Sequence, residues 1–148
     1  MRQATPVRIM LVDDHEMLRA GLRAMIEEHE DLLVIGEAGS GEEAIEQARR
    51  LKPDVVVMDL RLPGMNGIEA TRRIVKHDPA ARVLVLTLDA PEDVLLDVFE
   101  AGASGYLRKT GMAPRVVDAM RAVAEGKVVA DHGLVAALRA RKAHNELR

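Results

Sequence analysis

The chain has 148 residues, which is enough for one domain with little to spare. Its net charge of −3 would not attract it to nucleic acid or to an anionic membrane. Its only aromatic residues are Phe99 and Tyr106, which argues against binding single-stranded nucleic acid by stacking on the bases. The absence of cysteine excludes disulfides, thiolate metal sites and cysteine catalysis, and no apolar run approaches membrane-spanning length.

Taken in chain order, short apolar runs alternate with stretches whose apolar residues recur at helical spacing. The runs predict strands at residues 7–12, 32–35, 54–59, 82–87 and 103–107. The helical spacing predicts helices at residues 18–26, 44–51, 68–75, 94–99 and 116–124. Ser40 and Glu43 form a capping box before the second helix, and Gly36 is expected to close the second strand. The unbroken apolar run of the third strand indicates burial on both faces, as in a parallel sheet.

This alternation predicts an α/β fold, a doubly wound five-stranded parallel sheet flanked by five helices. The expected strand order is 2-1-3-4-5, which is flavodoxin-like. Residues 128–148 are different, because they become polar and basic toward their end. We expect a linker or C-terminal tail there, in which Leu134, Val135 and Leu138 would support only a short helix.

Groups that suit a phosphate and a metal follow four of the predicted strands. They are Asp13 and Asp14 after the first strand, Asp59 after the third, Thr87 after the fourth and Lys109 after the fifth. The carboxyl ends of parallel strands share one edge of a sheet, and ligands bind where the strand order reverses, here between the first and third strands. We therefore expect the three acids to meet there, beside the hydroxyl and the ammonium.

Three carboxylates packed together repel one another, and a divalent cation would relieve the repulsion. Mg²⁺ fits better than Zn²⁺, because the ligands are oxygens and the chain has no cysteine. The Asp59 carboxylate would also suit a nucleophile that forms an aspartyl phosphate. Lys109 would then neutralise the phosphoryl oxygens, and Thr87 would donate a hydrogen bond to one of them.

Three stretches that contain these groups form a recognisable pattern, at residues 11–15, 58–67 and 102–109. Together with Thr87 they make the chain similar to the receiver domain of two-component response regulators of the NarL/LuxR type. The resemblance covers about residues 6–127 and implies a CheY-like fold. It also implies that Asp59 is the phosphoacceptor, that Asp14 binds Mg²⁺ directly and Asp13 through water, and that the Arg61 carbonyl completes the metal ligands.

The same resemblance implies a switch. Thr87 would be drawn toward a phosphoryl group on Asp59, and Tyr106 would enter the space that Thr87 leaves; the alternative is that Tyr106 is only a half-buried strand residue. Arg61 and Asp89 have opposite charges and are expected to pair across the mouth of the site and restrict the attacking water, or else to be two solvated side chains.

The implied partner is a sensor histidine kinase. The resemblance also implies that this protein is cytoplasmic, makes no membrane contact and has no enzymatic activity beyond self-phosphorylation and autodephosphorylation. DNA binding would belong to an output domain outside this chain, and the sequence does not decide whether a homodimer forms. Three alternatives stay open: a stand-alone receiver, a degenerate receiver that acts only as an interaction module, and a small Mg²⁺-dependent phosphatase with an Asp nucleophile. Against the last alternative, this chain has Arg61 at the position where phosphatases of the haloacid-dehalogenase kind have a second Asp.

Overall fold

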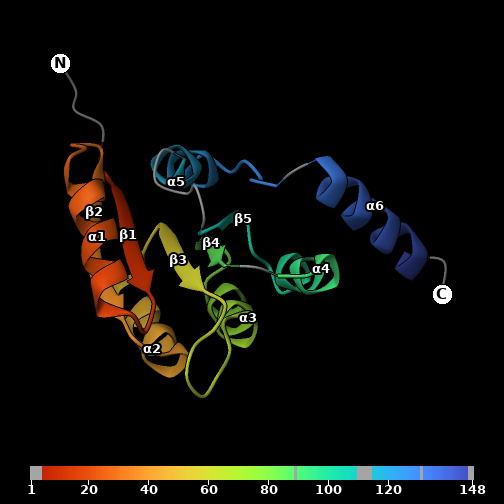
Figure 1. Ribbon diagram of the computed structural model, residues 1–148, viewed down its shortest axis with the longest axis horizontal. Coiled ribbons are helices and arrows are strands. Elements are labelled where there is room, and N and C mark those ends of the chain that lie inside the picture. Colours follow the sequence, from red (N-terminus) through yellow and green to blue (C-terminus); the bar gives the residue numbers. More distant parts are fainter. Residues whose placement is uncertain (1–4, 89, 110–114, 131, 147–148) are drawn as a thin grey trace.

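A computed structural model describes residues 5–88, 90–109, 115–130 and 132–146, and its centre is one parallel sheet (Figure 1). The strand order is β2-β1-β3-β4-β5, which confirms the predicted order. The strands are β1 (Val7–Val12), β2 (Leu32–Ala38), β3 (Val55–Asp59), β4 (Arg82–Thr87) and β5 (Gly105–Arg108). The helices are α1 (Glu16–Glu27), α2 (Gly41–Leu51), α3 (Gly67–His77), α4 (Glu92–Glu100), α5 (Val116–Ala124) and α6 (His132–Glu146). Among the described helices, none combines the length and the apolar character needed to cross a membrane.

Helices cover both faces of the sheet, so the core has two layers. One layer joins α1 and α5 to one face of the strands, and the other joins α2, α3, α4 and α6 to the opposite face. Along β3, Val55 and Val57 enter the first layer, whereas Val56 and Met58 enter the second. All five residues of β3 are buried, as its unbroken apolar run predicts.

The second strand is longer than the sequence predicts, because Gly36 lies inside it and does not end it. The pairing with β1 skips Ile35, which leaves a bulge at this point. A Cβ atom at Gly36 would lie 2.7 Å from Leu51 Cδ1 and 2.9 Å from Gln47 Oε1, both on α2. The glycine therefore allows a helix to pack closely on the strand, which is a tertiary requirement that a sequence pattern does not show.

The C-terminal residues form the 15-residue helix α6, which is longer than the short helix expected within the predicted linker or tail. This helix packs on α4: Leu134 is 3% exposed and belongs to the core layer that α4 helps to build. Arg141 lies 2.9 Å from Asp97 Oδ1 and 3.1 Å from Glu100 Oε2, both on α4. The apolar pattern of this segment is sparse, so its helix is stabilised mainly by contacts with α4.

Candidate functional site

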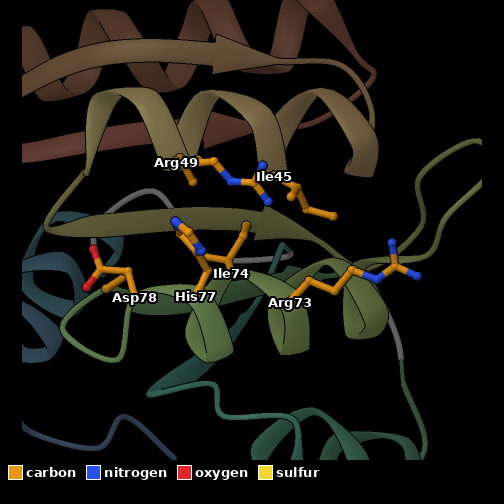
Figure 2. Close-up of a pocket in the computed structure, with 8 residues that line it drawn as sticks. Ile45, Arg49, Arg73, Ile74, His77 and Asp78 are labelled. Atoms are coloured by element: carbon orange, nitrogen blue, oxygen red, sulfur yellow. The ribbon is translucent and has the colours of Figure 1, made fainter.

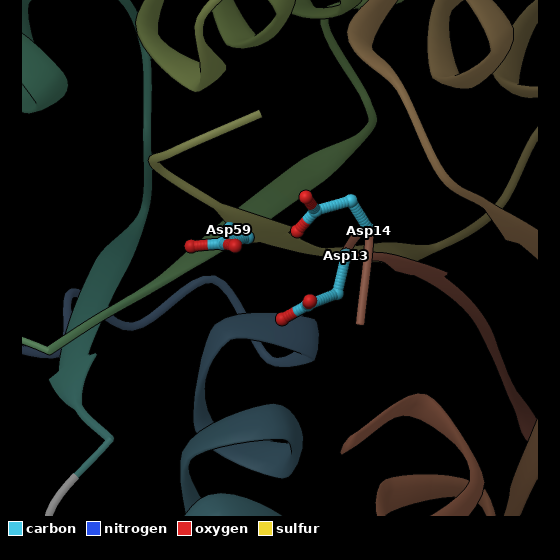
Figure 3. A group of neighbouring side chains, drawn as sticks. All are labelled: Asp13, Asp14 and Asp59. Atoms are coloured by element: carbon cyan, nitrogen blue, oxygen red, sulfur yellow. The ribbon is translucent and has the colours of Figure 1, made fainter. Parts of the chain in front are cut away.

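The three predicted acids meet at the carboxyl edge of the sheet. Asp13 and Asp14 follow β1, and Asp59 is the last residue of the neighbouring strand β3. Figure 3 shows the three side chains near one another, and one carboxylate oxygen from each lies within 4.8 Å of the others. Asp13 and Asp59 are buried, whereas Asp14 is exposed. The site therefore combines two buried carboxylates with a third that is exposed to solvent.

The ammonium of Lys109 joins this cluster from the end of β5. Its Nζ lies 3.2 Å from Asp13 Oδ2 and 3.3 Å from Asp59 Oδ1, so one cation bridges both buried carboxylates. The backbone N–H of Lys109 donates to the carbonyl of Thr87, at 2.7 Å. Thr87 is itself buried at the end of β4. The sheet thus brings together all five residues that the strand ends predict.

The electrostatics of the cluster favour a cation. Burial raises the pKa of Asp59, and the negative charge of Asp13 raises it further, against the opposing effects of Lys109 and of the Arg61 backbone N–H. A single ammonium does not balance the charge of three carboxylates, so an additional cation would be stabilised by the remaining negative charge. Carboxylate oxygens, one of them exposed to solvent, are the kind of ligand that Mg²⁺ prefers. The residues present therefore fit that ion.

The loop after β3 holds Asp59 in place through backbone contacts. The N–H of Arg61 donates to Asp59 Oδ1 at 3.3 Å, and the N–H of Gly67 donates to the Leu60 carbonyl at 2.9 Å. A Cβ atom at Gly67 would overlap the carbonyl oxygen of Asp59 and lie only 2.9 Å from Leu60 Cα. Gly67 is thus a supporting residue that sequence reasoning did not single out, although it belongs to the matched stretch at residues 58–67.

Two predicted features of this loop stay predictions. The Arg61 side chain is exposed, but Asp89 lies outside the described residues, and so does the pairing expected between them. The role of the Arg61 carbonyl as a metal ligand follows only from the resemblance.

Tyr106 is buried, not half-buried, and its ring contacts Phe99 of α4 edge-on, with centroids 6.3 Å apart and an interplanar angle of 87°. It pairs in register with Val85, and both belong to the core layer beneath α4. Because side chains alternate along a strand, Thr87 lies on the same face as Val85. Thr87 and Tyr106 therefore both face α4 from adjoining strands.

A hollow lies between α2 and α3 (Figure 2). Its lining includes Ile45, Arg49, Ile74 and His77. The last two stand near the C-terminal end of α3, whereas the acids lie at the edge from which α3 starts. None of the predicted site residues lines this hollow, so it is separate from the acidic site.

A parallel sheet of this order, with three carboxylates and a lysine at its carboxyl edge, defines the class of CheY-like receiver domains. Comparison with known families agrees with this class: the sequence matches the response regulator receiver domain over residues 9–121. The chain therefore belongs to the response regulator receiver domain family.

Relatives define the subfamily. The chain is 46% identical over 121 residues to the transcriptional regulatory protein LiaR of Bacillus subtilis (strain 168), covering 82% of this chain and 57% of LiaR. It is 40% identical over 121 residues to the response regulator UvrY of Escherichia coli (strain K12), covering 82% and 56%. A crystal structure of a LuxR-family two-component response regulator from Aurantimonas sp. SI85-9A1 superposes with a TM-score of 0.83 at 40% identity, covering 94% of this chain and 99% of that one.

These similarities confirm the expected NarL/LuxR-type subfamily. The chain spans about half the length of the curated relatives that it matches.

Proposed function

We propose that this receiver domain accepts a phosphoryl group on Asp59 and that the modified site controls an output, most simply transcription. The observation that supports this role best is the position of Asp59: it is buried, beside Asp13, with Lys109 Nζ 3.3 Å from its Oδ1. Residues 6–127 form the receiver in this proposal, and residues 128–148, which include α6, link it to further sequence.

The donor is a phosphohistidine of a sensor histidine kinase. An Asp59 carboxylate oxygen attacks the phosphorus, a P–O bond forms, the P–N bond breaks, and the imidazole leaves with the electron pair. Lys109 neutralises oxygens of the phosphoryl group, and the Thr87 hydroxyl donates a hydrogen bond to one of them. Water later attacks the phosphorus, which releases inorganic phosphate and restores the carboxylate. The chain is a single-turnover phosphoacceptor and not an enzyme acting on a separate substrate.

Mg²⁺ is the proposed cofactor, held by Asp13, Asp14, Asp59 and the Arg61 carbonyl. When bound, it would neutralise phosphoryl oxygens and hold them for transfer. This cofactor is supported by the charge of the cluster, because the single ammonium of Lys109 does not neutralise all three carboxylates.

The proposed switch involves Thr87 and Tyr106. A phosphoryl group adds charge and acceptor oxygens beside Thr87, and movement of that side chain changes the packing of Tyr106 beneath α4. Arg61 and Asp89 remain proposed modulators of the attacking water. The proposal places the protein in the cytoplasm without membrane contact. DNA binding is assigned to an output domain outside this chain, and a homodimer is a further partner to be tested.

Incubation with a small acyl phosphate and Mg²⁺ tests the proposal. We expect one acid-labile phosphate per chain, no label after chelation of Mg²⁺, and no label in Asp59→Asn. Asp93→Asn, on the exposed surface of α4, is the matched control and should label normally. Continuous release of phosphate over many turnovers would indicate a phosphatase instead. No labelling of the folded wild-type protein would indicate a passive interaction module.

A further inference from the structure

Arg19, a residue of α1, joins the acid-bearing loop after β1 to the neighbouring strand β2. Its Nη1 donates to the backbone carbonyl of Asp13, and its Nε donates to Glu37 Oε1 at 3.3 Å. The Arg19 side chain is only 16% exposed. One planar guanidinium therefore bridges two strand ends beside the acidic cluster.

Glu37 is a firm anchor for this guanidinium. It pairs in register with Leu11 in the β1–β2 ladder, and its carbonyl accepts a hydrogen bond from Gln47 Nε2 at 2.7 Å. Its other carboxylate oxygen accepts from Arg23. The Glu37 backbone is thus held by its own strand and by α2, and its carboxylate is held by a second arginine.

At the other end, Arg19 completes the hydrogen bonding of Asp13. The N–H of Asp13 donates to Ala38, its Oδ1 accepts from the His15 N–H at 2.8 Å, and its Oδ2 accepts from Lys109 at 3.2 Å. Its carbonyl is the remaining polar group, and Arg19 donates to it. That carbonyl belongs to the peptide plane from which Asp14 continues.

Asp14 has no such support. It is exposed, and across the described ranges its carboxylate has neither a hydrogen bond nor an ion pair. Its direction therefore depends on the backbone, and the backbone immediately before it is held by Arg19. Without that hold, rotation of the peptide between Asp13 and Asp14 would move the Asp14 carboxylate relative to Asp59.

We propose that Arg19 is a positioning residue for the metal-binding acids, which fixes the peptide between Asp13 and Asp14 before the cation binds. The inference rests on the proposed function, because it takes the acids to bind Mg²⁺. Two effects of removing Arg19 oppose each other. Loss of a nearby positive charge would tighten Mg²⁺ binding, whereas loss of positioning would weaken it, so the sign of the change decides between them.

The experiment compares Mg²⁺ affinity in the wild-type protein, Arg19→Met, Arg19→Lys and Arg23→Met by titration of backbone amide shifts. Arg19→Met should bind about tenfold more weakly, the typical effect of losing a group that orients a metal ligand. Arg19→Lys keeps the charge but loses the planar guanidinium, whose Nε and Nη1 donate to Glu37 and Asp13 in fixed directions, so it should also weaken binding. Arg23→Met removes the same charge from a more exposed side chain that pairs with Glu37 but not with Asp13, and should change affinity by less than about twofold.

Labelling by a small acyl phosphate gives a second readout. In Arg19→Met the Mg²⁺ concentration at half-maximal rate should rise about tenfold, while the rate at saturating Mg²⁺ stays near that of the wild type. Unchanged or tighter Mg²⁺ binding in both Arg19 variants would overturn the inference, as would an equal loss in Arg23→Met. If Arg19→Met does not fold, Arg19→Lys decides alone. Absence of Mg²⁺ binding by the wild-type protein would instead contradict the proposed function.

Discussion

Gly67→Ala should damage the site, although Gly67 is itself neither a proposed phosphate contact nor a proposed metal ligand. The new Cβ would lie 2.9 Å from Leu60 Cα, which is about 0.6–1.1 Å closer than the roughly 3.5–4.0 Å at which two carbons attract, and it would also overlap the Asp59 carbonyl. Both neighbours are backbone atoms, so the start of α3 or the end of β3 must move. Overpacking of this kind costs about 1–3 kcal/mol.

For a chain of this length, a loss of about 2 kcal/mol lowers the Tm by about 4–8 °C. A displaced Asp59 should also be phosphorylated at least about tenfold more slowly, because a 1 Å misplacement of a reacting group costs up to about a hundredfold in rate. Thermal unfolding measures the first effect and labelling by a small acyl phosphate the second.

The matched control is Gly21→Ala, in the middle of α1, where an added Cβ would meet no atom within 4 Å. This variant should be more stable by about 0.5–1 kcal/mol, since alanine favours a helix over glycine, and should be labelled at the wild-type rate. A Gly67→Ala protein with wild-type Tm and wild-type labelling would refute the argument that the backbone at Asp59 requires glycine.

Three further predictions concern charge and packing. Lys109→Met removes the cation between two buried carboxylates and should lower metal-free stability by about 3 kcal/mol, with partial recovery on adding Mg²⁺; an unchanged melting curve would count against the pairing. Asp14→Asn removes one repelling charge, so the metal-free Tm should rise by about 2–4 °C, and Mg²⁺ should no longer stabilise the fold. Retained stabilisation by Mg²⁺ would contradict the proposed role of Asp14 as a metal ligand. Leu134→Ala should weaken the packing of α6 on α4 by about 2–3 kcal/mol and speed hydrogen exchange in α6 but not in β3; unchanged exchange in α6 would show that Leu134 does not anchor it.

Sequence reasoning predicts the sheet and the acid cluster well, because both follow from local pattern and chain direction. The apolar run of β3 indicates a strand buried on both faces, and parallel strands must bring their carboxyl ends to one edge. Asp13, Asp14 and Asp59 meet for that reason.

The features that the sequence does not reveal depend on packing between distant segments. The sequence predicts that Gly36 ends a strand, whereas the structure shows that Gly36 is needed inside the strand because Leu51 of α2 packs against it. The helix α6 has few apolar residues at helical spacing, and its contacts with α4 stabilise it instead. The hydrogen bond from Arg19 to Asp13 depends on how α1 lies across β1 and β2, which no spacing along the chain encodes.

Mapping of the modified residue is the decisive test of the proposed role of Asp59. The protein is incubated with Mg²⁺ and a small acyl phosphate, digested, and analysed by tandem mass spectrometry after the acyl phosphate is trapped by reduction. We expect modification at Asp59 alone, lost when Mg²⁺ is chelated. Modification at another residue, or labelling that persists in Asp59→Asn, would contradict it.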